Sequence, residues 1–262
     1  MTCEQAQKVY VGAATPQNFV SNVETPFAGS TRALQEQVEL FLGGQTTAFH
    51  RVVQKESGVE KPFLAFQLPD KDLSHKLHTV LSDLAGPMIL SEYFSKMFET
   101  DLKVGAVSND TWIVYRELSD DAIVSIGVAV GGATDEQVFV TETQNISPGV
   151  IEFLVEQARN FINKVKTPFD DKVRELSGVK GRFFAAHMEA TNPLTETVHE
   201  VLSNLPALIH LKRHLSNQFG QNIEVGAVCC DTCPVFNGLD AKEVIAIQYS
   251  AIKVDAEGNT FS

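Results

Sequence analysis

The sequence predicts an α+β protein made of two similar units, each with a largely antiparallel sheet. Three observations lead to this fold class: ordered matches between the two halves of the chain, a helical apolar period early in each half, and short extended segments late in each half, separated by turns. Late strands joined by hairpins are typical of α+β folds rather than of a doubly wound parallel sheet. We expect the order β-α-β-α-β-β-β twice, with helices on one face of each sheet and a pseudo-two-fold relation between the units.

The two halves of the 262-residue chain match at an offset of about 120 residues. Clear matches are Ser57-Gly58-Val59 with Ser177-Gly178-Val179, Val104-Gly105-Ala106-Val107 with Val225-Gly226-Ala227-Val228, and Leu81, Ser82 and Leu84 with Leu202, Ser203 and Leu205. These matches predict an internal duplication, with an N-terminal arm at residues 1–17, a first repeat at residues 18–137 and a second at residues 138–262. The connection at residues 131–135 is a short turn, so we expect the two units to pack against each other.

Each unit is expected to begin with a short strand, at residues 19–23 and 138–143, followed by a helix. In the second unit the apolar residues between Ile151 and Val165 recur at i, i+3, i+4 and i+7, the stripe of a core-facing helix. In the first unit, Gly43-Gly44 is expected to end the corresponding helix.

A second strand is expected at residues 62–68 and 182–190. A helical stretch then begins at Asp72 and at Asn192-Pro193; Gly86-Pro87 divides it in the first unit, whereas Pro206 is expected only to kink it in the second. Three strands are expected to close each unit, at residues 103–107, 111–117 and 122–130 and at residues 224–229, 234–237 and 244–254. Because most of these strands mix apolar and polar residues, we expect each sheet to keep one uncovered face.

The acidic composition narrows the classes of partner. Asp and Glu number 33 against 21 Lys and Arg, giving a formal net charge of -12. Such a surface repels phosphate backbones, which disfavours nucleic-acid and anionic-membrane binding. No apolar run approaches the roughly 18 residues that span a bilayer. The N-terminus lacks the pattern of a signal peptide, and three of the four cysteines cluster between Cys229 and Cys233, unlike a disulfide framework. We therefore expect a cytoplasmic location, or a host cytoplasm for a viral protein.

The pair His78 and Ser82 recurs as His199 and Ser203, on the helix side that faces away from the predicted core. Three interpretations follow. The residues form two equivalent sites, or one shared site, where histidine acts as acid or base. They form an interaction face for a protein partner or another subunit. Or they have only a structural role, packing on the other half of the chain or capping a helix, or they recur by chance.

Two further patterns contain chemically capable side chains. Asp110 recurs as Asp231 at a predicted hairpin turn, where an aspartate normally bonds its own backbone and a catalytic or metal-binding role is the alternative. Cys230 and Cys233 form a C-x-x-C pair, as found in redox pairs and zinc sites. There is no second such pair, and this one follows a strand, so we predict neither a metal nor a cofactor.

The sequence contains no phosphate-binding loop, dinucleotide fingerprint, nucleophile elbow or kinase signature. It predicts a non-catalytic binding or assembly protein (a scaffold, adaptor or structural subunit) built as a fused pseudo-dimer, which associates with a protein partner or with itself. The alternative is an enzyme or small-ligand-binding protein with its site at the junction of the two repeats. His78, His199, Asp110 and Asp231 are the polar groups that would serve such a site.

Overall fold

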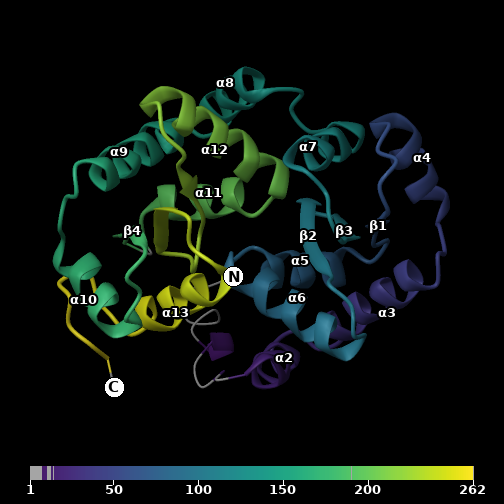
Figure 1. Cartoon of the computed structure of the whole chain (residues 1–262), viewed down its shortest axis with the longest axis horizontal. Helices are drawn as coiled ribbons and strands as arrows, with labels where there is room; N and C mark the ends of the chain where they lie inside the picture. The colour runs from purple at the N-terminus through teal and green to yellow at the C-terminus, as the bar shows by residue number, and fades with distance from the viewer. Residues whose placement is uncertain (1–7, 11–12, 14, 190, 262) are drawn as a thin grey trace.

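The computed structural model describes residues 8–10, 13, 15–189 and 191–261. Its first half contains α2 (Pro16–Glu24), α3 (Ser30–Leu42), α4 (Ala48–Ser57), β1 (Phe63–Gln67), α5 (Lys71–Leu81), α6 (Ala85–Met97), β2 (Lys103–Ser108), β3 (Thr111–Tyr115) and α7 (Asp120–Ala129). Its second half contains α8 (Glu136–Ile146), α9 (Val150–Ile162), α10 (Pro168–Ser177), β4 (Arg182–His187), α11 (Pro193–Leu202), α12 (Leu205–Phe219), β5 (Glu224–Val225), β6 (Thr232–Asn237) and α13 (Ala241–Ala251). The two halves lie side by side, the first on the right and the second on the left in Figure 1.

Each half contains one small antiparallel sheet of three strands. The strand orders are β1-β3-β2 and β4-β6-β5, so β3 and β6 are the central strands. The predicted α+β class and the antiparallel pairing are therefore confirmed. Strand β6, which the sequence indicates only at residues 234–237, pairs with β4 over six positions from Arg182–Asn237 to His187–Thr232.

Four predicted strands are helices instead. Residues 19–23 lie in α2, 122–130 mostly in α7, 138–143 in α8 and 244–254 mostly in α13. Each of these helices is preceded by an N-cap residue whose side chain accepts a hydrogen bond from the backbone N–H three residues later. The N-cap residues are Thr15, Ser119, Asp135 and Asp240. Such N-caps satisfy donors at the helix start and favour the helix over a strand. The observed order in each half is α-α-α-β-α-α-β-β-α.

Helices α4 and α10 were not predicted from the sequence, and Pro206 has a different role from the expected one. Helices α4 and α10 are capped at their N-termini by Thr47 and Thr167 and end at left-handed glycines, Gly58 and Gly178. Pro206 does not kink a continuous helix, because α11 ends at Leu202 and α12 starts afresh. Pro206 therefore lies in a first turn, where its missing N–H costs nothing.

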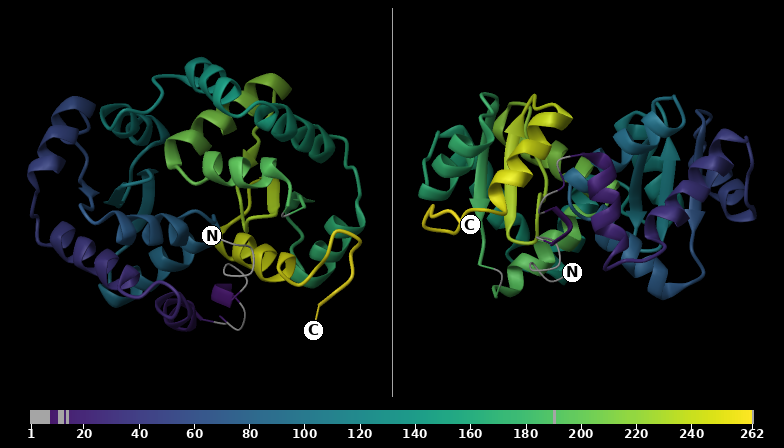
Figure 2. Two further views of the ribbon diagram at one scale, coloured as in Figure 1. Left: turned by 180° about the vertical axis from the view of Figure 1, so that it is seen from behind. Right: turned by 90° about the horizontal axis from the view of Figure 1, so that it is seen from below.

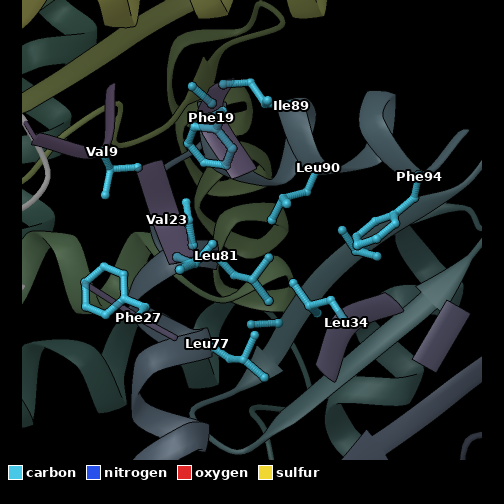
Figure 3. Packing of buried hydrophobic residues seen from close by; sticks show 14 of the residues in the cluster. Val9, Phe19, Val23, Phe27, Leu34, Leu77, Leu81, Ile89, Leu90 and Phe94 are labelled. Atoms are coloured by element: carbon cyan, nitrogen blue, oxygen red, sulfur yellow. The ribbon is translucent and has the colours of Figure 1, made fainter. Parts of the chain in front are cut away.

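Helices cover both faces of each sheet, so the prediction of one uncovered face is wrong. Val104 and Trp112 belong to a core with α2, α3, α5 and α6, whereas Phe63 and Ile113 belong to a core with α4 and α7. The second sheet is divided in the same way between two cores. Figure 3 shows the helix side of the first of these cores, with Phe19, Leu34, Leu77 and Phe94 directed inward. The strands are short, so a few apolar residues per strand suffice to bury both faces.

Several helices make contacts between the two halves. Helix α12 packs on α7 and on β2, and helix α13 packs on α6. Views from behind and from below show the same side-by-side arrangement (Figure 2).

The predicted arm at residues 1–17 lies partly outside the described residues. Its described part includes Val9 and Tyr10, which are buried in the first core. Across the described ranges, none of the helices is both long and apolar enough for a membrane crossing.

Candidate functional site

The two halves meet at two short linkers, one between α5 and α6 and the other between α11 and α12. Residues 82–84 connect α5 to α6, and the Leu84 N–H donates a 2.5 Å hydrogen bond to the carbonyl oxygen of Ala227. The side chain of Leu84 lies over Gly226, where a Cβ would come within 2.5 Å of Leu84 Cδ2. In the reverse direction, Leu205 lies over Gly105 of β2, where a Cβ would come within 2.4 Å of Leu205 Cδ1. Each half therefore places a leucine on a glycine beside the sheet of the other half.

The repeated histidines and serines meet at this junction in crossed pairs. His199 Nε2 lies 2.7 Å from Ser82 Oγ, and Ser203 Oγ lies 3.1 Å from His78 Nε2. Both serines are buried, and both histidines are largely so. Of the three interpretations from the sequence, packing on the other half describes where these side chains lie.

The hydrogen-bond directions decide what each pair can do chemically. The hydroxyl of Ser82 donates to the carbonyl oxygen of Thr79, and that of Ser203 donates to the carbonyl oxygen of Glu200, each at 2.7 Å. Each serine oxygen thus bonds both a backbone carbonyl of its own half and the histidine Nε2 of the opposite half. A serine activated as a nucleophile would instead give its proton to the histidine. Each pair joins the two halves at the junction.

Burial keeps both histidines neutral. It lowers the pKa of His78 to about 4 and that of His199 to about 4. The carboxylate of Asp83 lies 3.8 Å from His199 Nδ1 and is itself buried, which raises the pKa of Asp83 well above its usual range. At the corresponding place in the second half stands an amide, Asn204. The junction thus carries one buried carboxyl, on the first half.

The two predicted turn aspartates contact side chains of their own sheets or turns. Asp110 accepts hydrogen bonds from Gln67 Nε2 at 2.8 Å and from Ser108 Oγ at 2.9 Å. Asp231 accepts one from Cys229 Sγ at 2.7 Å and lies 3.5 Å from His187 Nε2. The structure therefore does not bring Asp110 or Asp231 into hydrogen bonding with the paired histidines.

The two cysteines of the C-x-x-C pair, Cys230 and Cys233, lie in different surroundings. Cys233 lies in β6 and belongs to the apolar core beneath α9 and α11, and burial raises its pKa to about 12. Cys230 lies at the preceding turn and is half-buried. Among the residues that the structure describes, no group of three or more His, Cys, Asp or Glu side chains is placed to hold a metal ion. Cys233 as a buried thiol is a poor metal ligand, because metals bind the thiolate.

A cleft of about 620 Å³ opens beside the crossed pairs. Its inner wall includes the hydroxyl-bearing Ser82 and Ser203, and its sides come from α6 and β2 of the first half and from the starts of α12 and α13 of the second. Most of the lining is apolar, and the principal apolar side chains are Leu81, Leu84, Met88, Leu202, Leu205 and Leu208. The cleft is thus a concave, mostly apolar site to which both halves contribute.

Sequence reasoning identified the serines of this cleft but not the cleft itself. Met88, Ser91 and Lys242 carry no repeated motif, and nothing in their spacing indicates that α6 and α13 meet. One pattern in the sequence could have indicated this cleft: Leu84 recurs as Leu205, and each leucine stands at the start of a helix, α6 or α12. Comparison of this chain with protein-family models, curated proteins and solved structures gives no match, so its function is argued from this geometry.

Proposed function

We propose that this chain is a non-catalytic binding protein, a fused pseudo-dimer that holds a small, largely apolar ligand in the cleft at the junction of its two units. The cleft carries the proposal. Its volume of about 620 Å³ falls in the range of roughly 300–1,000 Å³ that is usual for small-molecule sites. A site lined by both units gives a reason for joining them in one chain.

An internal duplication with pseudo-two-fold symmetry is supported by more than the sequence matches. From α2 to α7 and from α8 to α13 the described halves share one order of helices and strands, and in each sheet the third strand lies at the centre. The contacts Leu84–Gly226 and Leu205–Gly105 are reciprocal, as are the two His–Ser pairs. Reciprocal contacts are the mark of an isologous interface, as in a two-fold homodimer. We infer that the present chain fuses two copies of such a subunit.

We propose a small ligand rather than a protein partner because the face where a partner would bind is not free. That face is formed by His78, Ser82, His199 and Ser203. It is occupied by the opposite half of the same chain. The absence of catalysis is supported by the serine hydroxyls, whose hydrogens are directed at backbone carbonyls. A reducing, cytoplasmic location is part of the same proposal and is supported by Cys229 and Cys233, which lie in the core as thiols.

The direct test is binding of a neutral apolar fluorophore, N-phenylnaphthylamine, whose emission rises in apolar surroundings. We expect saturable binding to the full chain and a loss of at least about tenfold in affinity in Leu208→Trp, which fills the cleft. The matched control is Leu176→Trp, an exposed leucine of α10 that does not line the cleft. Equal affinity of the two variants, or no binding to the unchanged chain, would refute the proposal. Native mass spectrometry of protein purified from its natural source then gives the mass of any retained ligand.

A further inference from the structure

Across the junction from the cleft, helix α12 packs on α7, and two ion pairs join these helices. Lys212 Nζ lies 3.4 Å from Asp120 Oδ2, and the Arg213 guanidinium lies 2.7 Å from Asp121 Oδ1. These two bridges tie the start of α7 to α12. The same two helices approach closely at Gly127, where a Cβ would come within 2.5 Å of Pro206.

The residues that make these bridges are replaced at the cleft. At the offset that relates Gly105 to Gly226, Lys212 and Arg213 correspond to Ser91 and Glu92 of α6. At the same offset, Asp120 and Asp121 correspond to Ala241 and Lys242 of α13.

Neither bridge is formed beside the cleft: Glu92 and Lys242 keep opposite charges in exchanged positions, but Glu92 pairs with Lys96. Ser91 and Ala241 cannot form an ion pair, and Ser91 Oγ instead accepts a 3.2 Å hydrogen bond from the Val104 N–H. Among the described residues, the cleft therefore lies where neither bridge is formed.

The charges at the mouth of the cleft are unequal. Four charged residues line it: Glu92, Asp101, Lys103 and Lys242. Glu92 is paired with Lys96 at 2.5 Å, and Asp101 is paired with Lys103 at 3.4 Å. Within the described ranges Lys242 is exposed and forms no ion pair. An ammonium group thus stands without a carboxylate beside an apolar cleft, on a protein whose formal net charge is -12.

We propose that the ligand is a single-chain amphiphile with an anionic head group, its aliphatic chain in the cleft and its head group on Lys242. This inference rests on the proposed function and adds the ligand's chemical class. The apolar lining from Leu84, Met88 and Leu208 receives the chain, and burial of that chain supplies most of the affinity. The Lys242 ammonium makes an anionic head group bind more tightly than a neutral one, since a charge-assisted hydrogen bond is stronger than a neutral one.

The test compares three probes with the same chain and different head groups, each below its micelle concentration: dodecanoate, dodecanol and dodecyltrimethylammonium. Displacement of the bound fluorophore gives the three affinities. We expect dodecanoate to bind at least about fivefold tighter than dodecanol, and the cation to bind most weakly. Lys242→Glu should remove the advantage of dodecanoate and leave dodecanol unchanged. Lys253→Glu makes the same change in net charge away from the cleft lining and should alter neither.

A second variant tests the origin of the opening. Ser91→Lys with Ala241→Asp places at the cleft the pair that Lys212 and Asp120 make on the other side and leaves Lys242 in place. We expect this double variant to fold and to lose affinity for all three probes.

The outcomes separate the two proposals. If dodecanol binds and dodecanoate binds no tighter, or if Lys242→Glu leaves the preference intact, the head-group inference is wrong and the cleft remains a ligand site. If none of the three probes and no fluorophore binds, the proposed function itself fails.

Discussion

Leu205 at the start of α12 occupies the space that a side chain on Gly105 of β2 would fill: a Cβ there would lie 2.4 Å from Leu205 Cδ1. The reverse contact, Leu84 on Gly226, has a corresponding distance of 2.5 Å. Glycine within or beside a strand commonly marks such a close approach. The recurrence of Val-Gly-Ala-Val in both halves therefore has a packing reason at the junction.

This packing predicts the effect of adding a methyl group. We expect Gly105→Ala to destabilise the protein by about 1–3 kcal/mol, the usual cost of overpacking, because Leu205 must move aside. Gly226→Ala should act in the same way through Leu84. Urea denaturation measures both. As a control, Gly105→Ala made in a Leu205→Ala background should cost much less than it does alone; an equal cost in both backgrounds would show that the leucine is not the obstacle.

The junction histidines predict how stability depends on pH. Each has a folded pKa of about 4 against an ordinary value of 6.5, so the unfolded chain binds a proton that the folded chain excludes. Stability is therefore full above about pH 6.5 and falls as the pH drops from there to about 4, by on the order of 3 kcal/mol for each histidine. Asp83 acts in the opposite sense, because its raised pKa lets the folded state take up a proton more readily.

The check is the urea midpoint between about pH 7 and pH 4.5 in the unchanged chain and in His78→Gln with His199→Gln. Glutamine keeps a donor for each serine and cannot be protonated. The double variant should lose much of the acid sensitivity. An unchanged pH profile would mean that other groups govern it.

Asp83 predicts a stabilising substitution. Its carboxyl is buried and its pKa is raised, so ionisation near neutral pH costs stability. The second half carries Asn204 at the corresponding place. We expect Asp83→Asn to raise the free energy of unfolding at pH 7 by about 1–3 kcal/mol. The matched reverse change, Asn204→Asp, should lower it, and a loss of stability in Asp83→Asn would contradict this account.

The core cysteines predict a pattern of chemical protection. With its pKa raised to about 12 and its side chain buried, Cys233 should not react with iodoacetamide in the folded protein. Mass spectrometry of peptides after labelling at about pH 8, with and without urea, should show Cys233 modified only after unfolding. Half-buried Cys230 is the internal comparison. Rapid labelling of native Cys233 would place it outside the core.

Much of the secondary structure could be predicted from residue patterns. The i, i+3, i+4, i+7 stripe from Ile151 onward lies in α9, and Gly43 follows α3 as expected. Short apolar runs such as residues 122–130 could not be assigned, because a buried helix and a buried strand share that pattern. These residues form the helix α7 because it packs between α4 and α12 and because Ser119 caps its N-terminus.

The sequence by itself determined which residues recur, and the i, i+4 spacing that puts His78 and Ser82 on one side of a helix follows from local geometry alone. Only the tertiary structure decided that each histidine bonds the other half's serine, since His199 and Ser82 are separated by 117 positions. The cleft also belongs to the tertiary structure. Its lining comes from α6 and β2 of the first half and from the starts of α12 and α13 of the second, which are far apart in the sequence and meet only in the folded chain.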